Sequence, residues 1–437
     1  MTNMNTKVNR LITNDDLRKA NELNDFYLRF DTQNCVLECR EALDSLVIEN
    51  TSDRIIVDQQ KVCSIFSRLC TKKSTGPDGI SALLLKSCAE ELTVAWCPIF
   101  QQSRPGRSTE DAVNTVTYFI TKHLENPKAY ARLLFVDFSS AFNTVQPHRL
   151  IQKLKMFNVN SFLIKWYLSF LTNRTQQVRV NHTLSELKHI SIGVPQGCVS
   201  SPILFTLYTN ECSSCDHNNF IVKFSDDTAI LSLLHEKNDL SVYFSVISRF
   251  AEWCDLNHLI FNIEKTEEMI FDLRSIAGEG KREYLGIYVD NTLSWGIHVD
   301  TICSCMQQRL YFLRRLRLYG VDQKIMWLFY SAVIESIVRY GITVWFGNLT
   351  IQVKSKLARL VRIAVKTIGR KEILSLESLY EQSVLREAHK IVVDPLHVLY
   401  TEYELLPSGR RYRFPMCRYN RFKKSFIPFS IKLLNDE

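Results

Sequence analysis

Three aspartates stand where the sequence passes from one apolar stretch to the next. Asp226 and Asp227 lie side by side in "IVKFSDDTAILSLL" (221–234), and Asp137 follows the apolar run 133–136. Ser and Asp favour turns because their side chains bond the local backbone, so an ordinary hairpin turn is one interpretation of "SDD". Carboxylates gathered at a hairpin tip are also hard oxygen ligands for a divalent cation. The residues alone leave both interpretations open.

Carboxylates that meet in space repel one another unless a cation lies between them. Two magnesium ions about 3.5–4 Å apart, held by such carboxylates, activate an attacking hydroxyl and stabilise a leaving pyrophosphate in an in-line displacement. That chemistry is nucleotidyl transfer. It requires the strand that ends at Asp137 and the hairpin that carries Asp226 and Asp227 to be neighbours in one antiparallel sheet.

The elements around the acids follow from the spacing of apolar residues. Residues 104–126 predict a helix in which Ser108 or Thr109 is the N-cap. The apolar run 133–136 fits a buried central strand. The region from about 298 to 372 has helical spacing and is rich in Arg and aromatic residues. Helices with short strands between them predict an α+β fold.

Composition narrows the class of protein. The chain has 437 residues, of which 46% are hydrophobic and 23% charged, which is typical of globular protein with two or three domains. A net charge of +8 indicates an acidic partner, although such an excess also occurs without one. Thirteen cysteines without a repeated spacing, a polar N-terminal stretch and no long apolar run predict a nuclear or cytoplasmic protein that is neither secreted nor membrane-bound.

Five motifs occur in an order that resembles the palm of a reverse transcriptase. They are "FVDFSSAF", "GVPQGCVSSPILFTLY", "KFSDD", "LNHLIFNIEKT" and "YLGIYVD". The resemblance is to the non-LTR (LINE-type) retrotransposon enzymes, because "KSTGPDGIS", "RPGRSTEDA", "VWFGNLT" and "ELLPSGRRYR" also fit, and it extends from about residue 70 to the end. It implies a right-hand polymerase with an antiparallel palm sheet flanked by helices, a helical thumb and truncated fingers.

The resemblance also implies a division of the chain. The predicted regions are an N-terminal helical extension with a fingers remnant (1–103), the palm (104–290), the thumb (291–372) and a basic C-terminal region (373–437).

The resemblance implies roles for the acids and for one lysine. Asp137 and Asp226 match the chief metal ligands, Asp227 completes the acidic cluster, and the cofactor is a pair of Mg²⁺ ions, with Mn²⁺ as an alternative. Lys265 in "IEKT" matches the candidate general acid that protonates the departing pyrophosphate. Considered alone, a lysine in such a place is more often an ordinary solvated surface residue.

Substrate-binding residues are implied in the same way. Phe142 matches the steric gate, whose ring leaves no room for a 2′-hydroxyl; its alternative is a core aromatic. Gly193, Pro195, Gln196 and Gly197 match the loop that approaches the template and the incoming nucleotide. A plain strand-to-helix turn is the other interpretation of that loop.

Primer and RNA contacts complete the implied site. Tyr284, Leu285 and Gly286 match the primer grip, and would otherwise be a strand that ends in a turn. Arginines in "QQRLYFLRRLRLYG" (307–320) are suited to the phosphates of a primer-template duplex. "SGRRYR" and "NRFKKS", within 408–425, could bind RNA through charge and stacking. The implied partners are an RNA template, a DNA primer and deoxynucleoside triphosphates.

The sequence departs from the family pattern in several places. Where the family carries the fingers hairpin, two flanks join almost directly at 101–103, and a second shortening lies near 276–281. Ser225 replaces a usual Ala, and no endonuclease domain is expected before the polymerase. Fingers residues normally hold the incoming triphosphate, so we expect an internally deleted reverse transcriptase with impaired synthesis. The alternatives are an inactive nucleic-acid-binding remnant of the element and a decayed relic.

Overall fold

The computed structural model describes most of the chain in two compact units. The described residues are 14–31, 35–44, 86, 108–157, 159, 161–198, 200–212, 218–235, 240–272, 274, 280–370 and 374–437. Unit 1 comprises Met1–Gly106, Phe138–Ser213 and Ser248–Asn262, and unit 2 comprises Arg107–Asp137, Ser214–Ile247 and Ile263–Glu437. The predicted seam at 101–103 lies outside the described residues. The domain boundaries at 104, 291 and 373 stay predictions.

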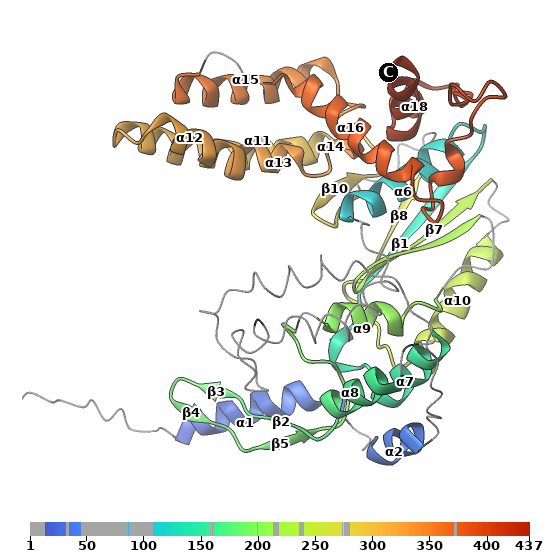
Figure 1. Cartoon of the computed structure of the whole chain (residues 1–437), viewed down its shortest axis with the longest axis vertical. Helices are drawn as coiled ribbons and strands as arrows, with labels where there is room; N and C mark the ends of the chain where they lie inside the picture. The colour runs from blue at the N-terminus through green and yellow to red at the C-terminus, as the bar shows by residue number, and fades with distance from the viewer. Residues whose placement is uncertain are drawn as a thin grey trace, which may run out of the picture. The chain divides into compact units, whose positions relative to one another are not determined.

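Unit 2 is built on a four-stranded antiparallel sheet (Figure 1). Its strands, in spatial order, are β6 (Asn219–Phe224), β7 (Asp227–Leu234), β1 (Tyr130–Val136) and β8 (Glu267–Phe271). Because β1 pairs with β7 on one side and with β8 on the other, the prediction of a central strand at 133–136 is confirmed.

The two faces of this sheet pack against different helices. Alternate residues Ala131, Leu133 and Phe135 are buried in the large core that includes helix α6 (Thr109–His123). On the other face Tyr130 is buried in a small cluster with residues of β7 and of helix α10 (Leu240–Leu256). Burial on both faces explains why this part of β1 reads as an unbroken apolar run.

Helix α6 begins as the sequence predicts. Ser108 is the N-cap: its hydroxyl accepts the Asp111 backbone N–H at 3.1 Å, and the Asp111 carboxylate accepts the Ser108 N–H at 2.7 Å. This reciprocal capping box satisfies two backbone donors at the start of the helix. The helix then packs along the sheet (Figure 1).

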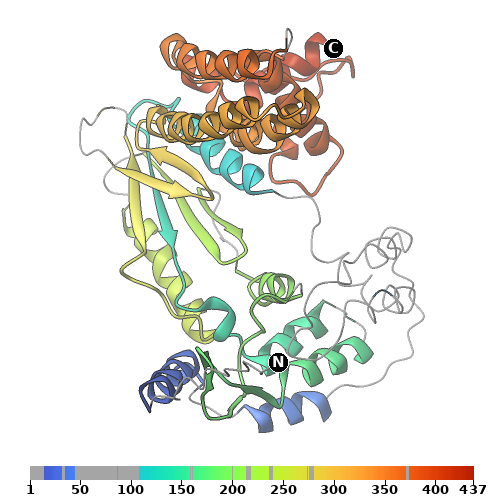
Figure 2. The same cartoon turned by 90° about the vertical axis from the view of Figure 1, so that its left-hand side faces the viewer.

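A hairpin and a set of helices follow the sheet. Strands β9 (Lys281–Tyr284) and β10 (Ile287–Asp290) pair with each other. The helices are α11 (Gly296–Leu318), α12 (Gln323–Phe329), the π-helix η3 (Tyr330–Glu335), α13 (Ser336–Arg339), α14 (Ile342–Trp345) and α15 (Ile351–Ile368). Helices α11 and α15 lie side by side (Figure 2). The predicted helical region is thus confirmed, but turns break it, two of them at Gly320 and Gly341 with positive φ.

The C-terminal region packs into the same core. It contains α16 (Leu376–Val392), the short 3₁₀ helix η4 (Tyr400–Glu402), α17 (Asn420–Lys423) and α18 (Phe426–Asp436). One hydrophobic cluster joins Phe271 of the sheet, Leu310 of α11, Leu360 of α15 and Ile431 of α18. Unit 2 therefore has a continuous core from the sheet to the last helix.

Unit 1 is mainly helical. Its elements are α1 (Asn14–Leu28), α2 (Val36–Asp44), the 3₁₀ helix η1 (Ala141–Asn143), α7 (Pro147–Met156), α8 (Ser161–Leu171), α9 (Ser201–Tyr208) and the two-stranded pairs β2–β5 (Arg174–Gln176 with Lys188–Ile190) and β3–β4 (Arg179–Val180 with Thr183–Leu184). Lys153, buried on α7, donates to the Tyr208 carbonyl at 2.6 Å and to Asn257 Oδ1 at 2.7 Å. These charge-assisted bonds tie α7 to the end of α9 and to the segment after α10.

The antiparallel sheet with flanking helices and the adjoining helical region confirm the predicted α+β class. None of the cysteines that the structure describes takes part in a disulfide. Within the described ranges, no helix has both the length and the apolar character needed to cross a bilayer.

Candidate active site

The strand register of unit 2 brings the three aspartates to one end of the sheet. In the β1–β7 pair Val136 lies opposite Thr228, so Asp137 and Asp227 are the next residues along each strand. Asp226 belongs to the two-residue turn that Phe224 and Asp227 close. The predicted hairpin is therefore present, and it carries the predicted acids beside the end of β1.

The acids interact electrostatically. Partial burial, followed by the negative charges of Asp226 and Asp137, raises the pKa of Asp227, while Arg282 acts in the opposite direction. A bound cation would stabilise the ionised form of a carboxylate whose pKa is raised in this way, and carboxylate oxygens are ligands that Mg²⁺ prefers. As their side chains lie, no three or more His, Cys, Asp and Glu residues of the described ranges form a group that could hold a metal ion. The acids thus match a divalent cation in charge and donor type, but their side chains are not arranged around one.

Lys265 lies next to the first of these acids. Its Nζ is 3.9 Å from Asp137 Oδ2, and its side chain is 70% exposed. The Asp137 backbone N–H points to Thr266 Oγ1 at 3.5 Å, which holds the end of β1 near the turn before β8. An ion pair this long and exposed is weak, so it does not prevent the Lys265 ammonium group from binding another group.

Arg282 is a neighbour of the acids that the sequence analysis missed. Its guanidinium forms an ion pair with Glu267 at 2.5 Å, donates to the Lys265 carbonyl at 2.9 Å and lies 5.2 Å from the Phe135 ring centroid. The period of two in a strand was the available signal, because it places Arg282 on the same side of β9 as Tyr284.

The predicted primer-grip residues form the tight turn between β9 and β10. Leu285 and Gly286 have φ of 49° and 77°, a pair of left-handed residues typical of a type I′ hairpin. The hydroxyl of Tyr340 donates to the Leu285 carbonyl at 2.7 Å. A Cβ on Gly286 would lie 3.1 Å from the Tyr340 ring, and Tyr284 is buried against Phe135.

Phe142 lies in unit 1, in the 3₁₀ helix η1. The side chain is half-buried, and its ring lies 5.4 Å from the Phe205 ring of α9 at a tilted angle. Part of the ring thus packs on a core aromatic and part remains exposed. Both the gate and the core interpretation are compatible with that position.

The predicted "GVPQG" loop is bonded to the Phe142 segment. Gly193 N–H donates to the Val145 carbonyl and Val194 N–H to the Phe142 carbonyl, both at 2.7 Å. A Cβ at Gly193 would lie 2.9 Å from the Asn143 Cα, so this approach of two backbones requires glycine.

The next two residues of the loop contact Asn143 and the start of helix α9. Gln196 Nε2 reaches Asn143 Oδ1 at 3.4 Å, and Pro195 accepts a bond from the Ser201 hydroxyl at the start of α9. Gly197 has a φ of 80° with open space beside it, so its conformation rather than crowding favours glycine.

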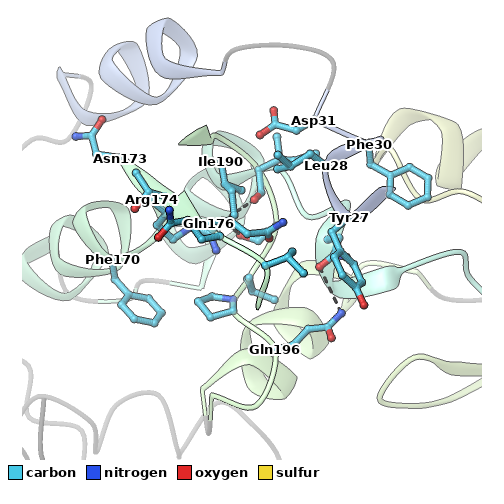
Figure 3. Close-up of a pocket in the computed structure, with 18 residues that line it drawn as sticks. Tyr27, Leu28, Phe30, Asp31, Phe170, Asn173, Arg174, Gln176, Ile190 and Gln196 are labelled. Atoms are coloured by element: carbon cyan, nitrogen blue, oxygen red, sulfur yellow. Dashed lines mark hydrogen bonds between the residues drawn. The ribbon is translucent and has the colours of Figure 1, made fainter. Parts of the chain in front are cut away.

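The same loop lines a cavity of about 750 Å³ within unit 1 (Figure 3). Phe170 lies on one side of the cavity, and Tyr27 and Gln196 lie on the other. The Arg174 guanidinium donates to the Gly193 carbonyl at 2.7 Å, and burial lowers the pKa of Arg174 to about 10. The sequence analysis missed Tyr27, because α1 is remote from the loop in sequence, and Arg174, because a lone arginine on β2 has no pattern that names its partner.

Four arginines of residues 307–320 are predicted to bind the phosphates of a primer-template duplex, and all are exposed on α11: Arg309, Arg314, Arg315 and Arg317. Arg317 donates to the carbonyls of Lys366 and Thr367, at 2.9 and 3.0 Å, and so caps the C-terminus of α15. Arg315 bonds the Tyr319 hydroxyl at 2.5 Å. Arg317, at least, therefore stabilises the packing of α11 against the end of α15.

Comparison with known proteins agrees with the motif order. Residues 82–289 match the family described as "Reverse transcriptase (RNA-dependent DNA polymerase)", and residues 295–336 match "Alkylated DNA repair protein alkB homolog 8, N-terminal". The "Probable RNA-directed DNA polymerase from transposon BS" of Drosophila melanogaster is 28% identical over 272 residues, 55% of this chain and 29% of that protein. The "RNA-directed DNA polymerase from mobile element jockey" of the same species is 27% identical over 292 residues, 60% of this chain and 30% of that protein.

These alignments thus span less than a third of the length of the curated relatives. Among solved structures, telomerase from Candida tropicalis in complex with a fragment of telomeric RNA is 12% identical, with a TM-score of 0.39 over 73% of this chain and 58% of that chain.

Proposed function

We propose, from the premise that this chain belongs to the reverse transcriptases of non-LTR retrotransposons, that it extends a DNA primer on an RNA template by nucleotidyl transfer. One observation carries the proposal: the β1–β7 register sets Asp137 beside Asp226 and Asp227 at the end of the sheet. Three carboxylates at that point repel one another and destabilise the fold unless a bound cation neutralises their charge.

The proposed metal ligands are Asp137, Asp226 and Asp227. Two Mg²⁺ ions bound by these carboxylates would activate the primer hydroxyl for attack and stabilise the leaving pyrophosphate, and Mn²⁺ could replace them. Lys265, next to Asp137, is the proposed proton donor to the pyrophosphate. Arg282 acts against the rise in the pKa of Asp227 and is the proposed electrostatic partner of that carboxylate.

The remaining predicted residues have proposed roles in substrate binding. Phe142 would exclude the 2′-hydroxyl of the incoming nucleotide, and Pro195, Gln196 and Gly197 would contact the templating pair. The turn at Leu285 and Gly286 would hold the primer end, because Tyr340 fixes its backbone.

Primer extension with Mg²⁺, a DNA primer and an RNA template tests the proposal. We expect deoxynucleotide incorporation that Asp226→Asn/Asp227→Asn reduces by at least about 10²-fold, the scale of removing one preorganised electrostatic group. The same assay with ribonucleotides in place of deoxynucleotides reports on the gate.

Asp300→Asn is the matched control, because Asp300 is an exposed acid of the same unit in an ion pair with Lys356. Equal activity of the wild type and the acid variant would contradict the proposal. Absence of incorporation by a folded wild-type protein would instead support the inactive remnant. The predicted fingers deletion makes slow synthesis the expected wild-type behaviour.

A further inference from the structure

We infer that residues 405–425, termed here the basic strap, form a binding surface for single-stranded nucleic acid that is separate from the proposed polymerase site. The strap lies in unit 2, after α16, and outside the matched reverse transcriptase region 82–289. It leads into α18 at the C-terminus (Figure 1). The inference rests on charge, anchoring and exposed apolar side chains, and it does not depend on catalysis.

The charge of the strap is entirely positive. It contains seven basic residues and no Asp or Glu: Arg410, Arg411, Arg413, Arg418, Arg421, Lys423 and Lys424. All are exposed except Arg421, which is half-buried. The nearest acid along the chain, Glu404, lies 3.4 Å from Arg413, but both side chains are well exposed, so this pair holds the arginine weakly. Such a run of exposed cations favours a polyanion as the partner.

The strap is fixed to the core of the unit rather than being a free basic tail. Asn435 of α18 accepts the Tyr412 backbone N–H at 2.7 Å and donates to the Tyr412 carbonyl at 3.0 Å. The Glu125 carboxylate accepts the backbone N–H groups of Arg418 and Tyr419. Phe422 is buried against Tyr118 of α6.

These anchors use main-chain groups and buried rings, so the basic side chains are left to point outward. A backbone already held in place loses less conformational entropy when a ligand binds than a free tail would lose.

Large side chains between the cations stay exposed in spite of this anchoring. Phe414 is 43% exposed, Tyr419 54% and Met416 88%. Aromatic rings exposed among arginines form stacking platforms for unpaired bases, while the cations bind the phosphates. A duplex offers phosphates, but its base faces are stacked inside it, and an acidic protein offers no backbone of phosphates with a base at each step. The observations therefore favour a single strand.

RNA and DNA single strands share this chemistry, so the test uses both. The measurement is fluorescence anisotropy of labelled 20-nucleotide RNA, DNA of the same sequence and the corresponding blunt duplex. Each is titrated with the full chain, and the variants described below separate binding at the strap from binding at the proposed polymerase site. We expect the single strands to bind at least about tenfold more tightly than the duplex.

Two sets of variants separate charge from stacking. The charge variant is Arg410→Gln/Arg411→Gln/Arg413→Gln, and it should weaken binding at least about tenfold. Each phosphate contact to a single strand contributes about 0.7 to the slope of log K against log salt, so the loss of three contacts should reduce the slope by about 2. Tyr419→Leu keeps an apolar side chain without the ring, so it should weaken binding several-fold with an unchanged salt slope.

The matched control is Arg359→Gln/Arg362→Gln/Lys366→Gln, which removes the same charge from exposed positions of α15. Unchanged circular dichroism of every variant shows that folding is intact. Equal losses in the control and strap variants, or duplex binding as tight as single-strand binding, would overturn the inference. Strap binding that persists in Asp226→Asn/Asp227→Asn would separate it from the proposed catalysis.

Discussion

Two hairpins of unit 2 each have a two-residue turn, and the two turns differ in residue type and in the side chains around them. The β9–β10 turn consists of Leu285 and Gly286, which Tyr340 covers and bonds. The β6–β7 turn consists of Ser225 and Asp226, and there Ser225 has a φ of 56°, a left-handed conformation without glycine. The first turn has glycine at one of its two left-handed positions and a ring packed against it, and the second has no glycine.

The difference indicates where this fold departs from the most stable choice. Glycine at a left-handed position and a covering side chain are what stability alone would select. The acidic turn instead combines a strained serine with like charges that raise the pKa of Asp227. Local departures of this kind cluster at functional sites, so the comparison supports the proposed role of the "SDD" turn.

The largest effect is expected in the covered turn. Gly286→Ala should lower the free energy of unfolding by about 1–2 kcal/mol, because an L-residue is strained there and its Cβ would press on the Tyr340 ring at 3.1 Å. Urea unfolding followed by circular dichroism measures the loss. The matched control is Gly320→Ala, which has a φ of 69° but no atom within 4 Å of the added Cβ, and it should lose less. Equal losses would mean that Tyr340 yields without resistance.

A smaller change of opposite sign is expected in the acidic turn. Ser225→Gly should raise the free energy of unfolding by about 0.5 kcal/mol, because relief of left-handed strain outweighs the greater entropy that glycine loses on folding. The same urea titration gives the value. A destabilised variant would show that the serine hydroxyl supports the turn and would remove the contrast between the two hairpins.

The smallest effect concerns charge. Asp227→Asn should stabilise the metal-free protein by a few tenths of a kcal/mol at pH 7, the low end for like charges on paired strands because salt screens exposed groups. The folded-state pKa of Asp227 is raised above 3.8, so folding becomes less favourable as the pH rises through that pKa.

The gain from Asp227→Asn should therefore be complete at neutral pH and shrink as the pH falls toward 3.8. Thermal unfolding of both proteins between pH 4 and pH 7, without divalent cations, checks the trend. A gain that grows on acidification would contradict it. Addition of Mg²⁺ should raise the melting temperature of the wild type more than that of the variant.

Several parts of the molecule were predictable because their causes are local. The capping box at Ser108 and Asp111, the central strand at 133–136 and the hairpin that carries Asp226 follow from short-range patterns. The neighbours Arg282, Arg174 and Tyr340 were not predicted. Their contacts join segments distant in sequence, and a lone Arg or Tyr has no pattern that names its partner.

By itself the sequence determined the order of the motifs and the α+β class, because residue type and spacing are enough for these. Only the tertiary structure decided which residues meet. The β1–β7 register placed Asp137 opposite Asp227, since a shift of one residue would have turned every side chain to the other face. It also decided that the basic C-terminal segment is anchored by Asn435 and Glu125, because those hydrogen bonds exist only once α6 and α18 are packed.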